Sequence, residues 1–193
     1  LPGLLMMNVI TNAVANTASS MLQMKLLQTL PELLITPLSS LELSLAFIIG
    51  GTVRGFVNGI LILLICIMVG MEIRDPVSTV FIIFVVAWSF SSLGLFIGQM
   101  SDSWDQLSLI QNFVLTPLSF LGGIFYSVTM LPEWGLAISK VNPVFYTINS
   151  LRYATLGASD APFASSMVFI VLFSLLLTTL AVKTMESGKK IRF

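Results

Sequence analysis

The chain has 193 residues, of which 56% are hydrophobic and only 9% are charged, and its mean hydropathy is +0.98. Soluble domains carry about 25% charged residues, so this composition excludes most soluble folds and indicates an integral membrane protein. Nine basic and nine acidic residues leave no net charge to attract a nucleic acid. With no histidine and a single cysteine, the chain can form neither an internal disulfide nor a histidine-dependent catalytic triad, and no metal site is expected.

Long runs without a charged residue predict where the chain crosses the membrane. A helix needs about 20 apolar residues to span the hydrocarbon core. The runs are continuous rather than alternating in polarity, which favours helices over the strands of a membrane barrel. We predict an all-α polytopic bundle with five spans, at residues 2–22, 44–70, 77–99, 107–128 and 164–183.

The C-terminal tail indicates the orientation of the bundle. The tail carries four cations between Lys183 and Arg192, and segments rich in Lys and Arg stay in the cytoplasm. A cytoplasmic C-terminus and five spans place Leu1 outside. Because Leu1 opens almost directly into a span and lacks the features of a signal peptide, we expect a further span to precede it in the full protein. Both ends would then be cytoplasmic.

The connection between the first two spans has the pattern of an ordered loop. Thr29-Leu-Pro-Glu32 and Ser39-Ser-Leu-Glu42 each have the form of a capping box, and Pro37 disfavours a helical conformation at the residue before it. We predict a short helix near residues 30–36 at the cytoplasmic surface, followed by a cap that begins the second span. Two interpretations remain open, a simple connector and a docking surface for a cytoplasmic partner.

A second capping pattern precedes the fourth span. Asp102-Ser-Trp-Asp105 places two carboxylates where they can accept hydrogen bonds from free N–H groups and interact favourably with the helix dipole. Trp104 is well placed as an anchor at the membrane interface.

Residues 117–160 are too apolar for a free external loop and too broken for a further span. Pro117 interrupts a span, and Pro132 and Pro143 each stand where a proline begins a short helix. We predict two short helices that dip into the outer leaflet or lie on it. Irregular backbone at that depth must be buried in protein or line a cavity.

Asparagines recur every four residues along the first span, at Asn8, Asn12 and Asn16, and this spacing places them on one helical face. Amides are costly to expose to lipid, so this face must turn toward other helices or toward water. Hydrogen bonding between helices and the lining of a substrate path both remain open.

Arg54 is the only charge deep within a span, about ten residues or roughly 15 Å from the cytoplasmic end of the second one. An intramembrane arginine is costly unless it is paired or hydrated, which makes it a candidate functional residue together with Asn58 one turn further on. The alternatives are snorkelling toward the cytoplasmic headgroups and a structural pairing with Asp102, Asp105 or the C-terminus of a helix.

Small residues at a spacing of four allow helices to approach closely. Two such patterns occur, one on the second span and one on the third. Their members, which we expect to serve helix packing, are Gly51, Gly55, Gly59, Gly94 and Gly98.

The sequence contains no phosphate-binding GxxxxGK[ST] motif, so the chain is not expected to be an ATPase or any other enzyme. It also has no carboxylate within a predicted span, which weakens the case for a proton-coupled carrier.

Several short motifs occur in a characteristic order along the whole chain. They are Pro2-Gly3-Leu4, Glu32 through Leu38, Gly122 through Ser127, Leu131-Pro132-Glu133-Trp134, Asn142-Pro143 with Tyr146, and Leu151-Arg152-Tyr153. In this order and spacing they resemble the permease subunits of ABC-2 type transporters, in particular the bacterial inner-membrane branch that exports drugs and lipo-oligosaccharides.

The resemblance implies one transmembrane domain over residues 1–193, with the second to sixth spans of a six-span fold. An interfacial helix and the first span would lie before Leu1. It further implies that two permease chains pair with two separate nucleotide-binding subunits, which hold ATP and Mg²⁺, so that this chain needs no cofactor of its own. A coupling helix would contact the ATPase through Gln28, Thr29, Glu32, Thr36 and Pro37. Ahead of Glu32 the family tends to be more charged than the Leu30-Pro31 found here.

The family also has outer half-helices between its last two spans. By resemblance, the residues that carry this motif here are Leu131, Pro132, Glu133, Trp134, Asn142, Pro143 and Arg152. We therefore expect an export permease in the bacterial inner membrane, in contact with lipid and with no nucleic-acid partner. It would move an amphiphile such as a drug, a lipid or a saccharide conjugate. The alternatives are a non-transporting scaffold subunit and an ion-coupled carrier.

Overall fold

The structure is a computed structural model that describes residues 1–30 and 37–188. Within these residues the chain is all-helical and contains no strand, so the predicted fold class is confirmed at that level. The α-helices are α1 (Pro2–Leu26), α3 (Ser40–Met68), α4 (Pro76–Met100), α5 (Trp104–Ile110), α6 (Thr116–Leu121), α7 (Glu133–Val141), α8 (Pro143–Leu156) and α9 (Phe163–Ser187). A π-helical segment, η1 (Gln111–Leu115), joins α5 to α6, and a 3₁₀ turn, η2 (Val128–Met130), precedes α7.

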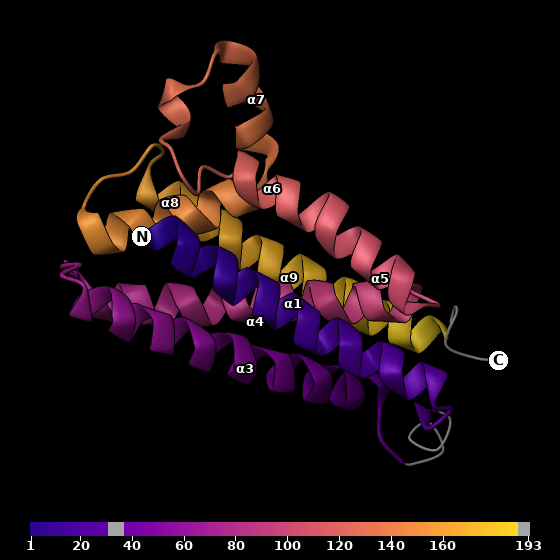
Figure 1. Cartoon of the computed structure of the whole chain (residues 1–193). Coiled ribbons are helices and arrows are strands. Elements are labelled where there is room, and N and C mark those ends of the chain that lie inside the picture. The colour runs from indigo at the N-terminus through magenta and orange to yellow at the C-terminus, as the bar shows by residue number, and fades with distance from the viewer. Residues whose placement is uncertain (31–36, 189–193) are drawn as a thin grey trace.

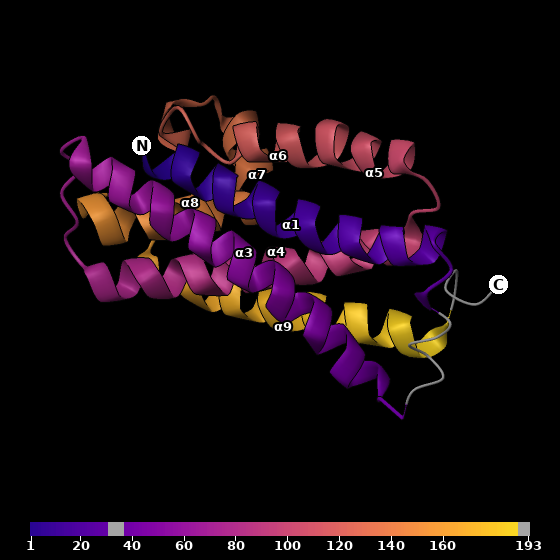
Figure 2. The ribbon, with the colours of Figure 1, turned by 60° about the horizontal axis from the view of Figure 1, so that its bottom comes forward.

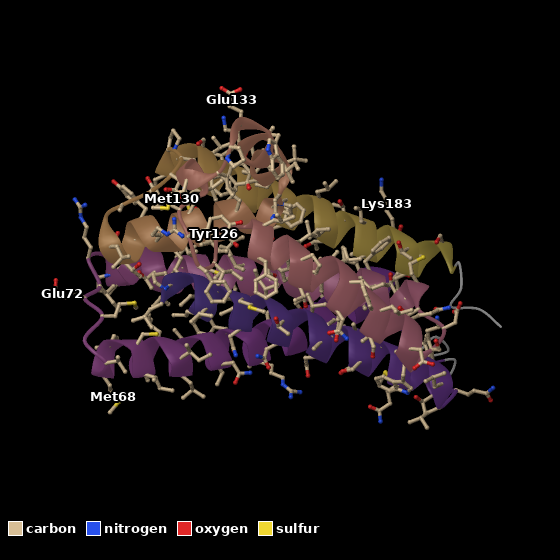
Figure 3. The ribbon with its side chains drawn as sticks, turned by 45° about the horizontal axis from the view of Figure 1, so that its top comes forward. Met68, Glu72, Tyr126, Met130, Glu133 and Lys183 are labelled. Carbon is tan, nitrogen blue, oxygen red and sulfur yellow. The ribbon has the colours of Figure 1, made fainter. Side chains whose placement is uncertain are left out.

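Helix α1 occupies the centre of a bundle of long helices, packed against both α4 and α3, and α9 covers another side of α4 (Figure 1). The α5–η1–α6 segment runs alongside α1, on the side away from α9 (Figure 2). The N-terminus lies near α7 and α8 at one end of the bundle, and the end of α9 lies at the other. At the first of these ends, Glu133 points away from the bundle from the tip of the projecting α7 (Figure 3).

Among the described residues, three helices are long and apolar enough to cross a membrane: α3, α4 and α9. They correspond to the predicted spans 44–70, 77–99 and 164–183. Helix α1 covers the predicted span 2–22 and is just as long as α4, but its asparagines, serines and threonines leave it outside this group. The five-span count therefore stays a prediction.

The predicted span 107–128 is wrong at its C-terminal end, because the helix stops at Leu121. Gly122 and Gly123 follow, and Gly123 has a φ of +85°, a conformation that glycine adopts without the steric cost of a side chain. Before this stop, Pro117 lacks the N–H that would bond a preceding carbonyl. The helix widens there into η1, and the Thr116 N–H bonds the Gln111 carbonyl five residues back.

Two of the predicted helix caps fall on described residues, and they have different outcomes. The capping box at Ser39 and Glu42 is confirmed, because each side chain bonds the backbone N–H of the other residue. For α5, the predicted carboxylate in the first turn is present as Asp105, but the N-cap is Ser103 rather than an aspartate. The Ser103 hydroxyl accepts the Gln106 N–H. Asp102 forms an ion pair with Lys25, whose Nζ lies 3.2 Å from the Asp102 Oδ1.

Close approach between α1 and α4 depends on two glycines of α4. A Cβ built on Gly94 would lie 2.6 Å from the Val14 carbonyl oxygen, and one built on Gly98 would lie 2.8 Å from the Ala18 carbonyl oxygen. The three glycines of α3 face side chains of both α1 and α4 in the same way, and they are Gly51, Gly55 and Gly59. A side chain at Gly94 or Gly98 would push α1 and α4 apart, because it would meet backbone atoms, and one at the glycines of α3 would displace the side chains that they face.

Two short helices do follow the predicted prolines, although the two prolines occupy different cap positions. Pro143 is the first residue of α8, as predicted, whereas Pro132 is the N-cap of α7 rather than a first-turn residue. Most residues of α8 are buried, since α8 packs against α9, α4 and α1. Most residues of α7 are exposed, including Trp134.

Candidate functional site

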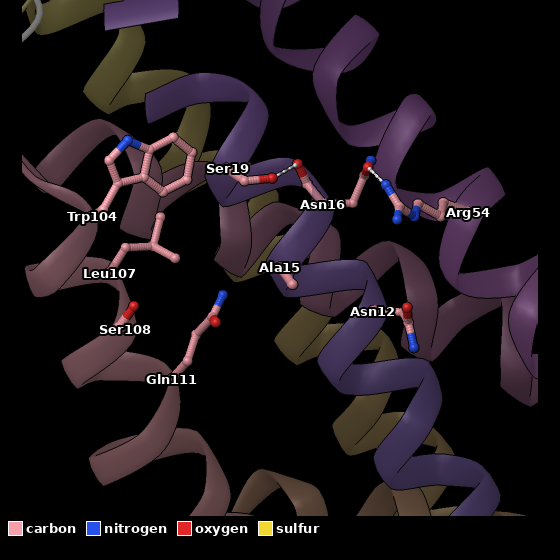
Figure 4. A pocket seen from close by; sticks show the side chains of 9 residues that line it. All are labelled: Asn12, Ala15, Asn16, Ser19, Arg54, Trp104, Leu107, Ser108 and Gln111. Atoms are coloured by element: carbon pink, nitrogen blue, oxygen red, sulfur yellow. Dashed lines mark hydrogen bonds between the residues drawn. The ribbon is translucent and has the colours of Figure 1, made fainter. Parts of the chain in front are cut away.

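A polar cleft runs over α1 between α3 and the α5–η1 segment (Figure 4). Arg54 lies on one side of α1, and the side chains of α5 and η1 lie on the other. The cleft has a volume of about 270 Å³. It is lined by Asn12, Ala15, Asn16, Ser19, Arg54, Trp104, Leu107, Ser108 and Gln111.

Two further pockets adjoin the polar cleft and share lining residues with it. Asn12 also lines a pocket of about 550 Å³ toward the N-terminus of α1, whose other walls are mostly apolar. Gln111 also lines a small pocket of about 60 Å³ between α1, η1 and α6. Thr11 borders both of these pockets. The three cavities therefore lie next to one another along one surface of α1.

The predicted asparagine face forms the floor of this surface. The Asn12 amide donates to the Asn8 carbonyl at 3.0 Å and to the Asn8 side-chain oxygen at 2.9 Å. The Asn16 side-chain oxygen accepts a hydrogen bond from Arg54 Nη1 at 2.7 Å. Both interpretations of this face thus have structural support, since the asparagines bond to each other and to α3 while they also line a cavity.

Arg54 is the central residue of the 29-residue helix α3, about 21 Å from either end, which is deeper than the sequence pattern indicated. Its side chain is exposed on the single chain, and within the described residues it has no carboxylate partner. The predicted pairing with Asp102 or Asp105 is wrong. Asp102 instead pairs with Lys25. Asn58 is half-buried and lines none of the three cavities.

Sequence reasoning missed the opposite wall of the cleft. Trp104, which was predicted as an interfacial anchor, also lines the cavity. Gln111 follows it two helical turns later, and its Nε2 is buried without a hydrogen-bond partner among the described residues. The spacing of Trp104, Ser108 and Gln111 places them on one helical face, which is the signal that could have identified them.

The predicted coupling segment is described only at its two ends. Gln28 is exposed and has a φ of +56°, a conformation unusual for a residue with a side chain. Thr29 lies next to it, and Pro37 is exposed at the far end. Glu32 and Thr36 lie outside the described residues.

A buried lysine immediately precedes this segment. The first predicted span ended at residue 22, whereas Lys25 belongs to the last turn of α1 and its side chain is only 5% exposed. Its ammonium group donates to the Gln99 and Ser101 carbonyl oxygens at 3.1 and 2.7 Å, beside the ion pair with Asp102. The cation thereby joins the C-terminal end of α1 to that of α4, where carbonyl groups lack helical partners.

At the opposite end of the bundle, Arg152 forms the centre of a partly buried network. Its Nη1 donates to the Asp160 carboxylate at 2.9 Å, and its Nη2 donates to the Gly123 and Tyr126 carbonyl oxygens at 2.8 and 3.3 Å. Asp160 also accepts the Val128 N–H at 2.9 Å. The network therefore connects α8, the loop before α9 and the turn after α6.

The other residues of the predicted outer motif divide into two groups. Asn142 is buried, and its amide donates to the Leu118 carbonyl at 2.5 Å, which ties α8 to α6. Pro143 adjoins it as the first residue of α8. The remaining four lie at the start of α7 and are exposed or half-buried: Leu131, Pro132, Glu133 and Trp134.

Known proteins are similar to this chain, some over nearly its whole length and others over less than half of it. The family model for the ABC-2 type transporter matches residues 1–156. The inner membrane transport permease YadH of Escherichia coli K12 is 36% identical over 192 residues, which are 99% of this chain and 75% of YadH. Nodulation protein J of Rhizobium leguminosarum bv. viciae is 30% identical over 76 residues, 39% of this chain and 29% of that protein. Nodulation protein J of Rhizobium meliloti is 26% identical over 77 residues, 40% of this chain and 29% of that protein.

The family match covers more than half of the chain, and the full-length similarity to YadH agrees with the apolar helices of the structure. The chain therefore belongs to the ABC-2 type transporter family, as a multi-pass membrane transport permease.

Proposed function

We propose that the chain is the membrane subunit of an ABC exporter and moves an amphiphilic substrate along the polar cleft over α1. ATP would be bound with Mg²⁺ and hydrolysed by a separate nucleotide-binding subunit. The full protein would have six spans with both termini in the cytoplasm of a bacterial cell, and two copies would face each other in the inner membrane.

The position of Arg54 carries this proposal. An exposed guanidinium at the centre of a membrane-spanning helix costs several kcal/mol in contact with lipid, by insertion scales about 2.5 to 3.5 kcal/mol. Arg54 has no carboxylate partner in the described chain; Asn16 of α1 accepts a hydrogen bond from it, and further polar side chains of α1 and η1 line the same cleft. A surface with this chemistry is stable in a bilayer when it faces water, substrate or a second protein chain rather than lipid.

The ends of α1 and α3 support a route for coupling. The segment from Gln28 to Pro37 joins these two helices, and both helices border the cleft. A movement of this segment by the ATPase would act on α1 and α3 together. Lys25 would pass the movement to the C-terminal end of α4 through its hydrogen bonds there.

The proposal is tested in proteoliposomes that contain the full-length permease and its partner ABC ATPase. Phospholipids and glycolipids labelled with an NBD fluorophore serve as probes, and dithionite reduces the fluorophores on the outer surface. We expect ATP, but not a non-hydrolysable analogue, to change the fraction of at least one probe that dithionite reaches. An assembled complex that moves no probe would favour the scaffold alternative. Loss of movement on collapse of a proton gradient, with ATP maintained, would favour the ion-coupled carrier.

The coupling segment is tested separately by the double variant Glu32→Arg with Thr36→Ala. We expect weaker co-purification of the ATPase and loss of the ATPase stimulation by the permease. Glu72→Arg is the matched control, because Glu72 is exposed in the turn between α3 and α4 at the other end of the bundle. Unchanged association and unchanged stimulation in the double variant would refute the coupling role.

A further inference from the structure

The charged side chain that lines the cleft is positive, and no negative side chain accompanies it among the described residues. Among the described residues, Arg54 is the only charged side chain that lines the three neighbouring cavities, and no described Asp or Glu borders any of them. Within the described chain its guanidinium makes a single side-chain hydrogen bond, to Asn16. A guanidinium has five N–H donors, so most of its capacity remains for another acceptor.

The opposite wall supplies a further unpaired donor. Gln111 Nε2 is buried and has no hydrogen-bond partner among the described residues. Figure 4 shows its amide group directed toward α1, next to Ala15. A buried donor without an acceptor costs about 1 to 3 kcal/mol, so a rotation of the Gln111 side chain toward an acceptor in the cleft would be favourable. Ser108 adds a hydroxyl on the same wall.

An apolar compartment adjoins this polar one. The pocket of about 550 Å³ shares Asn12 with the polar cleft and continues along Leu4, Leu5, Met7 and Ile62. A molecule with an acceptor-rich head and an apolar tail would place the head beside Arg54 and the tail in this pocket.

We propose that the cleft selects amphiphiles with an anionic head, a phosphate or a carboxylate, and that Arg54 supplies the counter-charge. This inference rests on the proposed permease function and adds a substrate class to it. A cationic amphiphile would meet an uncompensated positive charge in a low-dielectric site and would be rejected. The Asn16 side chain orients the guanidinium, since it accepts from Nη1 and leaves the other donors directed elsewhere.

The test measures binding by the full-length permease in phosphatidylcholine nanodiscs without an ATPase. The probes are dodecyl phosphate, dodecyltrimethylammonium and inorganic phosphate. The readout is the tryptophan fluorescence in a background where the exposed Trp134 is replaced by Phe, which leaves Trp88 and Trp104 as the fluorophores of this sequence. Trp104→Phe identifies the signal that comes from the cleft.

We expect dodecyl phosphate to bind more tightly than dodecyltrimethylammonium. Arg54→Gln should weaken dodecyl phosphate binding about tenfold or more, the range expected for one charge-assisted hydrogen bond. Arg54→Lys keeps the charge and should restore most of the affinity. Arg74→Gln is the matched control, because Arg74 is exposed at the turn between α3 and α4 and lines none of the three cavities. It should leave binding unchanged.

Competition by inorganic phosphate tests whether the cleft binds an anionic amphiphile or free phosphate. We expect inorganic phosphate not to compete at concentrations that saturate dodecyl phosphate, because it has no tail for the apolar pocket. Strong competition would overturn the amphiphile assignment in favour of a free-phosphate site.

Equal binding of the anionic and cationic probes, or unchanged affinity in Arg54→Gln, would overturn the anion preference. If Arg54→Gln does not fold, the anion preference is decided by Arg54→Lys and by the affinities of the unaltered protein for dodecyl phosphate and dodecyltrimethylammonium. ATP-driven movement of NBD-labelled lipids with no anion preference would refute this inference and leave the permease function standing. Selective binding of the anionic probe without any ATP-driven movement would support this inference and refute the permease function.

Discussion

Gly94→Ala provides a direct test of the packing at the centre of the bundle. The added Cβ would lie 2.6 Å from the Val14 carbonyl oxygen and 2.9 Å from the Val14 Cα. These atoms belong to the backbone of α1, so no side-chain rotation can relieve the contact. The two helices must move apart, and the buried groups around the contact lose part of their packing.

The size of the effect follows from two opposing terms. Overpacking a close contact costs about 1 to 3 kcal/mol. Replacing a helical glycine with alanine gains about 0.8 to 1 kcal/mol from helix propensity. Gly50→Ala isolates the second term, because a Cβ on Gly50 meets no atom within 4 Å. Helix propensity contributes to both variants, so the difference in stability between them should approach the overpacking cost alone.

The assay is the SDS-dependent unfolding of the full-length protein in mild detergent micelles, with refolding to establish reversibility. We expect Gly94→Ala to lower the midpoint and Gly50→Ala to leave it unchanged or raise it. Equal midpoints for the two variants would show that α1 and α4 do not approach as closely as the structure has them.

Three further predictions concern charged groups. Lys25→Met should lower the free energy of unfolding by about 1.5 to 3 kcal/mol in the same assay, because carbonyl groups at the end of α4 lose a charged donor. An unchanged free energy would show that these hydrogen bonds do not hold α1 to α4. Arg152→Met should cost about 3 to 5 kcal/mol by leaving a partly buried carboxylate unpaired, and Asp160→Asn in the same chain should recover part of it. The hydroxyl and the N–H of Ser78 hold the pKa of Asp75 below its ordinary value, so this stabilisation is present above pH about 3.9 and is lost as the pH falls through the lower folded value. Asp75→Asn should therefore flatten the acid side of the thermal-stability profile, and a profile that keeps its slope would contradict the capping role.

Local patterns in the sequence were sufficient for features that depend on near neighbours. The apolar runs located α3, α4 and α9 to within a few residues, because length and hydropathy are properties of one helix. Ser39 and Glu42 form the predicted capping box because both partners lie within a single turn. The same reasoning failed where a helix stop depended on Gly122 and Gly123, since a double glycine within an apolar run leaves the hydropathy almost unchanged.

Only the tertiary structure decided which side chains far apart in the sequence form hydrogen bonds and ion pairs with each other. The sequence by itself established an all-helical membrane protein, one deep arginine and a polar face on α1. It could not show that Arg54 bonds Asn16, or that Lys25 takes Asp102 away from its predicted capping role. Such pairings join residues tens of positions apart, and they depend on which faces of neighbouring helices turn toward each other. That choice is made by close packing at glycine contacts such as the one at Gly94, and helical periodicity alone does not specify it.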